Sequence, residues 1–298
     1  MARPTPDPHP VTRLSVNLNK VALLRNARGG GRPDLLRLAA VCLDAGAAGL
    51  TLHPRPDGRH ARAADVLGLA RLARDRGAEM NVEGNPFEGP SQTRAPGTGA
   101  PGAGGYAFPG FVALVREARP AQATLVPDAA GQLTSDHGFA VGQDGAFRDA
   151  ERLAPLIETL HDAGCRVSVF VDADVRAVRA ARAVGADRVE LYTGPYAHAA
   201  ARGDARADLA ACSAAAAEAR ALGLGLNAGH DLDLANLGPL LAAARAAAAP
   251  GVDEVSVGQA LVADALDRGL AATVAAYVAI CAGAPPGPTP GAGTGGHR

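Results

Sequence analysis

The chain has 298 residues, of which 48% are hydrophobic, and its formal net charge at pH 7 is −1. Such a chain can bury a large core as one domain of barrel size or as two smaller domains, so disorder throughout is excluded. The charge is balanced and 3% of the residues are aromatic. Because the sequence holds no basic stripe and no stacking platform, we expect no nucleic-acid partner.

The predicted strands lie at 14–19, 49–53, 79–83, 123–127, 166–171, 188–193, 223–228 and 254–258. Stretches of helical periodicity follow them at 33–45, 61–76, 108–118, 146–163, 174–184, 204–221, 233–248 and 260–281. Several helices end at a glycine that leads into the next strand, as at Gly46, Gly164 and Gly185. The eight units predict a single-domain α/β fold, a (β/α)₈ TIM barrel over residues 13–282, with a doubly wound open sheet as the alternative.

Three segments fall outside the repeated pattern. Residues 1–12 are proline-rich and predict a flexible extension, residues 86–107 predict a flexible Pro/Gly-rich insertion, and residues 283–298 predict a disordered tail. Residues 1–10 contain no apolar stretch of the kind found in signal peptides and no apolar run reaches membrane-spanning length, so we expect no membrane partner. The four cysteines are dispersed, which disfavours a disulfide framework or a zinc site and fits a cytoplasmic location.

The polar residues of the sequence follow the predicted strands, where the active site of a barrel forms. Among them, His53 begins the stiff loop His-Pro-Arg-Pro-Asp-Gly-Arg-His, Glu83 ends the third strand and His230 follows the seventh. Because a carboxylate and two imidazoles transfer protons near neutral pH, this set indicates acid–base chemistry. Buried amides and carboxylates must also pair with each other or with a ligand.

Arginines and glycines suggest a phosphorylated substrate. Arg25, Arg28 and Arg55 offer bidentate partners for an oxyanion. Gly258 and Gln259 stand after the eighth strand at a predicted helix N-terminus, which is a frequent phosphate site in barrels.

Lys20 is the single lysine beside 28 arginines. Lysine carries a compact charge that can also be lost, which the arginine fork cannot imitate. Lys20 is therefore either a site residue that arginine cannot replace or a chance survivor of compositional drift.

Together these residues resemble the pyridoxine 5′-phosphate synthase family, cofactor-free barrel enzymes of vitamin B6 biosynthesis. The resemblance extends from residue 14 to about residue 280 and rests on motifs that run through the chain. These include Asn17, Leu-Arg-Asn-Ala-Arg-Gly at 24–29, His53-x-Arg55, Asn81-Val82-Glu83, Glu190-x-Tyr192-Thr193-Gly194 and Asn227-Ala228-Gly229-His230.

The resemblance implies a condensation of 3-amino-2-oxopropyl phosphate with 1-deoxy-D-xylulose 5-phosphate that yields pyridoxine 5′-phosphate, phosphate and water. It implies a homo-oligomer, an octamer, that uses no cofactor and no metal. The implied catalytic residues are His53, Glu83, Glu190 and His230. The implied substrate-binding residues are Asn17, Asn19, Lys20, Arg28, Arg55, His60, Thr134, Asp231, Gly258 and Gln259.

The chain departs from the commoner family pattern at several of these positions. Asn19-Lys20 stands where Asp-His is the commoner pattern; one branch of the family has this Asn-Lys variant, and we expect it to make the site more positive. Gln259 replaces a usual histidine, and Asp231 occupies a position that is often glycine.

Three other functions fit parts of the pattern. A metal-dependent barrel hydrolase would use His53, His60, Glu83 and His230 as ligands, which a cation at position 20 would oppose. A Schiff-base aldolase would use Lys20 as its nucleophile. A barrel that binds a phosphorylated metabolite without turnover would not need the acid–base groups.

Overall fold

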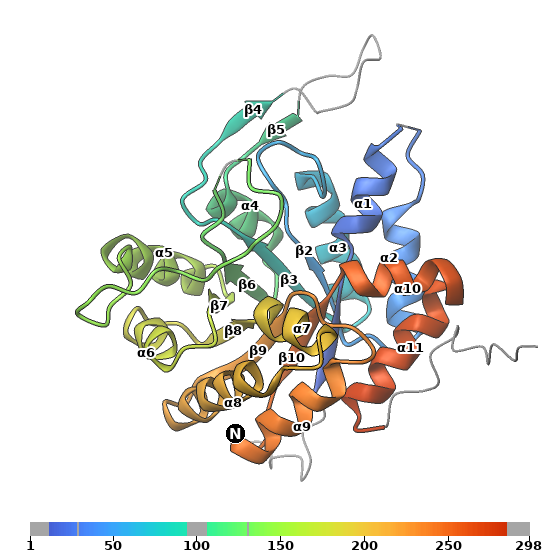
Figure 1. Cartoon of the computed structure of the whole chain (residues 1–298). Helices are drawn as coiled ribbons and strands as arrows, with labels where there is room; N and C mark the ends of the chain where they lie inside the picture. The colour runs from blue at the N-terminus through green and yellow to red at the C-terminus, as the bar shows by residue number, and fades with distance from the viewer. Residues whose placement is uncertain (1–11, 29, 94–105, 130, 285–298) are drawn as a thin grey trace, which may run out of the picture.

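The computed structural model describes residues 12–28, 30–93, 106–129 and 131–284. Eight parallel strands close into a barrel in the order β1-β2-β3-β6-β7-β8-β9-β10, with β10 paired to β1 (Figure 1). The strands are β1 (Arg13–Asn17), β2 (Gly49–Leu52), β3 (Glu79–Gly84), β6 (Gln122–Leu125), β7 (Arg166–Val171), β8 (Arg188–Tyr192), β9 (Gly225–Gly229) and β10 (Glu254–Val257). The predicted (β/α)₈ barrel is confirmed.

Helices surround the barrel and connect its strands. Those at predicted places are α2 (Leu35–Asp44), α3 (Ala63–Asp75), α4 (Phe111–Ala118), α5 (Ala150–Asp162), α6 (Val175–Ala183), α8 (Arg206–Ala221), α9 (Leu237–Ala247), α10 (Gln259–Arg268) and α11 (Leu270–Cys281). The prediction of one helix over 260–281 was wrong, because Gly269 with φ +81° divides it. Two further helices, α1 (Asn19–Asn26) and α7 (Gly194–Ala201), follow β1 and β8.

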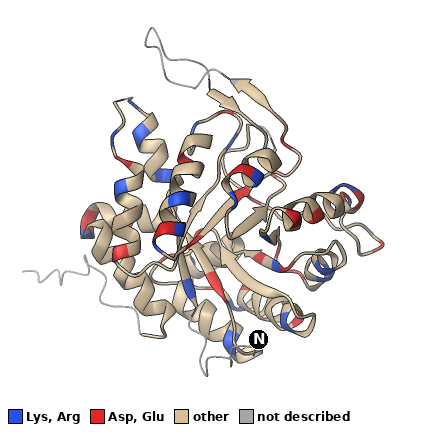
Figure 2. Ribbon diagram, turned by 180° about the vertical axis from the view of Figure 1, so that it is seen from behind, with Lys and Arg blue, Asp and Glu red and all other residues tan. Residues whose placement is uncertain are grey.

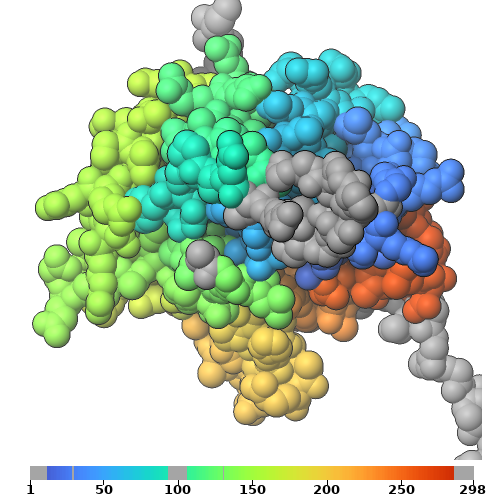
Figure 3. Space-filling model, turned by 90° about the horizontal axis from the view of Figure 1, so that it is seen from above, coloured from blue at the N-terminus to red at the C-terminus, as the bar shows by residue number. Residues whose placement is uncertain are grey.

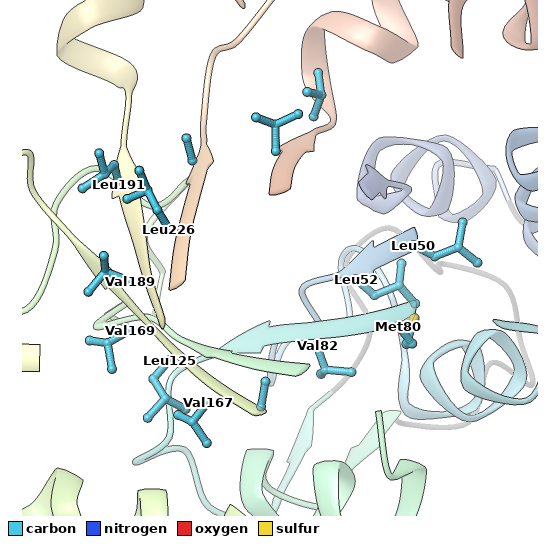
Figure 4. Packing of buried hydrophobic residues seen from close by; sticks show 14 of the residues in the cluster. Leu50, Leu52, Met80, Val82, Leu125, Val167, Val169, Val189, Leu191 and Leu226 are labelled. Atoms are coloured by element: carbon cyan, nitrogen blue, oxygen red, sulfur yellow. The ribbon is translucent and has the colours of Figure 1, made fainter. Parts of the chain in front are cut away.

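The pleat of the strands separates two kinds of side chain. Apolar residues point outward and pack under the helices, as Figure 4 shows for Leu50, Val82, Val169 and others, each at most 2% exposed. Polar residues on the alternate positions fill the barrel and are buried: Ser15, Thr51, Asn81, Glu83, Gln122, Thr124, Ser168, Glu190, Asn227, Glu254 and Ser256. The barrel interior is therefore a hydrogen-bonded polar layer.

Contacts between strands pair most of this polar interior, although the buried Ser168 Oγ has no hydrogen-bond partner among the described residues. Ser15 and Thr51 hydroxyls lie 2.6 Å apart, and Gln122 Nε2 donates to Glu254 Oε1 at 3.2 Å. At the amino-terminal end of the strands, Glu79 accepts from Arg13 Nη1 at 2.7 Å and also pairs with Arg166. Paired in this way, the buried groups avoid the cost of burial without a partner.

The ends of the predicted insertion form a small hairpin. Strands β4 (Ser91–Thr93) and β5 (Tyr106–Phe108) pair antiparallel, and residues 94–105 lie outside the described residues. Figure 3 shows the hairpin on the outer surface of the molecule, seen from above. The predicted extension and tail lie almost entirely outside the described residues as well.

The surface carries mixed charge. Figure 2 shows acidic and basic residues interspersed over the helices of this side of the molecule, without segregation by sign. Among the residues that the structure describes, no helix combines the length and the apolar character that crossing a membrane requires.

Candidate active site

A cavity of about 490 Å³ opens at the carboxyl ends of the strands. The residues predicted to form the site and found in its lining are Asn17, Asn19, Lys20, His53, Arg55, His60, Glu83, Thr134, Glu190, His230, Asp231, Gly258 and Gln259. The structure therefore brings together residues from widely separated parts of the sequence.

Two of the predicted anion ligands are placed differently. Arg28 is exposed just beyond α1 and does not line the cavity. Arg25 is bound by Asp65, with Nη1 2.5 Å from Oδ1 and Nη2 2.8 Å from Oδ2. Its guanidinium thus holds α1 against α3, and Arg55 is the arginine that faces the cavity.

Glu83 on β3 is held by three neutral donors. Its Oε1 accepts from Asn81 Nδ2 and Ser256 Oγ, each at 3.3 Å, and its Oε2 accepts from Asn17 Nδ2 at 3.4 Å. The side chain is buried at the base of the cavity. This arrangement fixes the direction of the carboxylate with long hydrogen bonds and places it where a ligand can reach it.

His53 lies between two carboxylates. Its Nδ1 is 3.7 Å from Glu83 Oε2, and its Nε2 is 3.1 Å from Asp128 Oδ2. Burial acts to lower the pKa of His53, but the carboxylates of Asp128 and Glu83 outweigh burial and raise it. His53 is therefore suited to hold a proton that it can donate to a substrate.

Asp128 joins His53 to Arg55. Its Oδ2 is 2.5 Å from Arg55 Nη2, and all three side chains are buried. Burial alone would raise the pKa of Asp128, but the contacts with His53 and Arg55 lower it to about 2. Asp128 was not among the residues predicted to form the site, although its position directly after the fourth predicted strand was an available signal.

Glu190 is the second carboxyl group of the barrel centre. Burial, followed by the charges of Glu83 and Glu254, raises the pKa of Glu190 well above its ordinary range. Thr124 Oγ1 donates to its Oε2 at 3.4 Å. A side chain at Gly229 would place its Cβ 2.4 Å from Glu190 Oε1, so this glycine makes room for the carboxyl. The raised pKa favours the protonated form of Glu190, so Glu190 and Glu83 can act in opposite roles.

His230 occupies a constrained backbone position. His230 and Asp231 have φ values of +87° and +56°, which are uncommon for residues with side chains. Thr193 Oγ1 donates to the carbonyls of Gly229 and His230 at 2.7 and 2.6 Å and holds this turn. The φ of Asp231 explains why glycine can stand at this position.

The His230 ring is oriented by contacts on both nitrogens and on one edge. Its Nε2 lies 2.9 Å from Thr134 Oγ1, and its Nδ1 lies 3.3 Å from Asp231 Oδ2. Tyr192, which the predicted site did not include, packs edge-to-face with it at 5.3 Å between ring centroids. Contact with His230 is also the main cause that lowers the pKa of Asp231.

Two helix beginnings face the cavity. Asn19 is the first residue of α1. Its backbone N–H donates to Asn17 Oδ1 at 3.0 Å, and its side-chain Oδ1 accepts from the backbone N–H of His53 at 3.1 Å. Gly258 precedes α10, and no side chain caps the first turn of that helix. The first-turn N–H groups at Gln259 therefore stay available for an anion.

Lys20 lines the cavity from the first turn of α1. We expect Lys20→Arg to lower kcat/KM roughly tenfold, about 1.4 kcal/mol, because the guanidinium is wider and directs its donors differently. Arg76→Lys is the control, since Arg76 forms an exposed ion pair with Asp44. Equal and negligible effects in steady-state kinetics would make the single lysine an accident of composition.

The buried His60 leads to a prediction for how the free energy of unfolding changes with pH. Burial, then the charges of Arg59, Lys20, Arg55 and His53, lowers the pKa of His60 from 6.5 to about 3. Between these values the unfolded chain binds one more proton than the folded chain, so this group destabilises the fold as pH falls. In urea unfolding at pH 7.5 and 5.0, we expect His60→Gln to lose less stability than the wild type.

The control for His60 is His137, whose side chain is exposed. His137→Gln, which removes an exposed contact with Asp136, should lose at least as much stability between the two pH values as the wild type. An equal loss in His60→Gln and in the wild type would contradict a neutral, buried His60.

Among the residues that the structure describes, no group of three or more His, Cys, Asp or Glu side chains is arranged to hold a metal ion. The side chains that converge in the cavity are acid–base groups, amides and cations. Together the closed barrel and this cavity define the class of (β/α)₈ barrel proteins with an acid–base site at the carboxyl ends of their strands.

The family follows from comparison with known proteins. The model of the family described as "Pyridoxal phosphate biosynthesis protein PdxJ" matches residues 14–283, and the chain belongs to this family. Pyridoxine 5′-phosphate synthase of Xanthomonas oryzae pv. oryzae (strain PXO99A) is 53% identical over 91% of this chain and 97% of its own length. The proteins of that name from Xanthomonas axonopodis pv. citri (strain 306) and Xylella fastidiosa (strain 9a5c) are 54% and 49% identical, each over 90% of this chain, and 96% and 94% of their own lengths.

Solved structures of low sequence identity share the fold. Thiamine phosphate pyrophosphorylase from Pyrococcus furiosus matches with a TM-score of 0.54 at 11% identity, over 92% of this chain and 96% of its own. Tryptophan synthase from M. tuberculosis matches with a TM-score of 0.53 at 12% identity, over 92% and 93%. These likenesses concern the barrel alone.

Proposed function

We propose that this chain is an enzyme that synthesises pyridoxine 5′-phosphate from 3-amino-2-oxopropyl phosphate and 1-deoxy-D-xylulose 5-phosphate, releasing phosphate and water. The observation that carries the proposal is the buried Glu83 carboxylate, which lies beside His53 in a cavity that also contains Glu190 and His230. Relatives that are 53% and 49% identical to this chain are named pyridoxine 5′-phosphate synthase.

The named groups supply the proton transfers that ring closure needs. Condensation of an amine with a ketone releases water, and formation of the carbon–carbon bond requires removal of a proton next to a carbonyl. Glu83 is the proposed base for the second step, and His53 and His230 are the proposed proton donors to departing oxygen. Protonated Glu190 stabilises developing negative charge by donating a hydrogen bond.

Two anion positions fit two phosphorylated substrates. The first-turn N–H groups of α10, at Gly258 and Gln259, bind one phosphate. Arg55, His60 and Thr134 contact the deoxyxylulose phosphate, and Asn17 contacts the aminoketone phosphate. Arg28 was also predicted to contact the aminoketone phosphate. Because Arg28 does not line the cavity, its position in this chain does not support that contact.

The state of the protein in the cell belongs to the same proposal. We infer a cytoplasmic homo-oligomer, an octamer, without a cofactor. Light scattering of the purified full chain measures the oligomeric state.

The test is turnover of both phosphates by enzyme freed of metal, with pyridoxine 5′-phosphate detected by its absorbance. We expect product with chelator present. Activity that chelators abolish and a divalent ion restores would support a metal-dependent hydrolase. Covalent trapping by borohydride with a ketose phosphate would support a Schiff-base aldolase. Binding of the phosphates without turnover would support a non-catalytic binding protein.

A further inference from the structure

The connection between β2 and α3, residues 53–62, is here named the β2–α3 loop. It carries His53, Arg55 and His60 into the cavity. It contains no regular secondary structure, so its shape depends on contacts with its surroundings. Arg59 of the loop donates to the carbonyls of Gln132 and Leu133, and the loop is held from two further sides.

One side is the end of α1. Asn26 Nδ2 donates to three successive carbonyls of the loop, those of Gly58, Arg59 and His60, at 3.3, 3.0 and 2.7 Å. A single amide thereby binds the second half of the loop. This contact comes from α1, the helix that follows the first barrel strand.

The other side is the β4–β5 hairpin. The Tyr106 hydroxyl accepts a hydrogen bond from the N–H of Ala63, the first residue of α3, at 3.0 Å. The Tyr106 ring lies directly on Gly58, where an added Cβ would come within 2.6 Å of Tyr106 Cδ1. Gly58 also has φ +63°, so both the turn and the ring require glycine at this position.

Phe108 continues the contact toward the catalytic residues. It is 2% exposed and lines a second cavity, of about 170 Å³, whose walls include His53, Arg55 and Asp128. The hairpin therefore reaches a second cavity that shares His53 and Arg55 with the main cavity. In Figure 1 the strands β4 and β5 lie beside the blue connection that leads from β2 to α3.

We propose that the β4–β5 hairpin is a positioning element of the active site, in which Tyr106 and Phe108 hold the β2–α3 loop so that Arg55 and His60 face the substrate. Tyr106 acts through the loop and does not itself line the main cavity. The part of this proposal that concerns substrate affinity rests on the proposed function. The part that concerns the loop does not.

The first test uses hydrogen exchange of the full chain, read by mass spectrometry on peptides that cover residues 54–63. Tyr106→Phe removes only the hydroxyl, and Tyr106→Ala also removes the ring. We expect exchange to accelerate roughly three- to tenfold in Tyr106→Phe, the size of one hydrogen bond, and more in Tyr106→Ala. Gln92→Ala, on the exposed part of β4, is the matched control and should exchange as the wild type does.

The second test uses steady-state kinetics with the same variants. We expect the KM for 1-deoxy-D-xylulose 5-phosphate to rise several-fold in Tyr106→Phe and further in Tyr106→Ala, with kcat within about twofold and the KM for the aminoketone phosphate unchanged. A purely structural role would instead lower the melting temperature and change both KM values together.

The outcomes separate the two parts of the proposal. Wild-type exchange and wild-type KM values in Tyr106→Ala would overturn it, and so would a parallel rise of both KM values. A wild-type chain without turnover would refute the proposed function, while the exchange measurement would still decide whether the hairpin holds the loop.

Discussion

Glu83→Gln should lower turnover by roughly 10²-fold or more while the fold stays intact. The variant keeps the shape of the side chain and loses the charge that can accept a proton. Glutamine also offers only one oxygen to the three donors that now bind Glu83, from Asn17, Asn81 and Ser256. Because the charge of Glu83, after burial, helps to raise the pKa of Glu190, the variant should also lower that pKa.

The measurement is kcat at saturating concentrations of both phosphates, with circular dichroism and a melting curve to verify the fold. Glu151→Gln is the matched control, since Glu151 is exposed in the first turn of α5. Near-normal turnover of Glu83→Gln would remove this residue from the proposed mechanism.

The barrel could be predicted because hydrophobic periodicity and glycine helix ends are local features of the sequence. The structure shifts the predicted strand ends by up to two residues. The first strand ends at Asn17, since Asn19 begins α1. The alternation of Asn17, Leu18 and Asn19 imitates a strand, whereas the contacts of Asn19 with Asn17 Oδ1 and with the backbone N–H of His53 show that the chain has turned.

Two short helices and the hairpin could not be predicted in the same way. Helix α7 has eight residues, and Pro195 in its first turn was its only strong local signal. The hairpin strands have three residues each, within a segment whose composition suggests a flexible loop. Helix α7 and the hairpin are too short to be stable alone and depend on packing against the barrel, which the periodicity of the sequence does not reveal.

Much of the candidate site was predictable because the topology brings the carboxyl ends of all eight strands together. What the sequence lacks is direction and distance. Arg25 and Arg28 belong to one motif, yet in the structure Arg25 forms an ion pair with Asp65 and Arg28 is exposed. The importance of Asp128 depends on its distances to His53 and Arg55, which no spacing along the chain encodes.

Asp128→Asn should lower kcat/KM by roughly 10²-fold and lower the melting temperature by several degrees. Asp128 is 5% exposed and is the buried anion between Arg55 and His53. Breaking a buried ion pair by removing one partner costs about 3–5 kcal/mol, and the remaining carbonyl oxygen of asparagine offsets part of that cost. Arg55 would also lose the contact that directs it toward the cavity.

The same variant has a signature in pH. Contact with Asp128 is the largest of the causes that raise the pKa of His53, so this pKa should fall in Asp128→Asn, as NMR titration of the imidazole would show. If protonated His53 is the proton donor, activity declines as pH rises through its pKa. The decline should therefore begin at a lower pH in the variant than in the wild type.

Asp149→Asn is the control for Asp128→Asn, because Asp149 pairs with Arg152 at 3.2 Å on the exposed surface and such pairs contribute little. Its kinetics and melting temperature should match those of the wild type. An Asp128→Asn enzyme with an unchanged His53 pKa and normal kcat/KM would show that the ion pair is dispensable. A fall in melting temperature without a shift of the pH profile would restrict Asp128 to a structural role, since only a change in the protonation of His53 moves that profile.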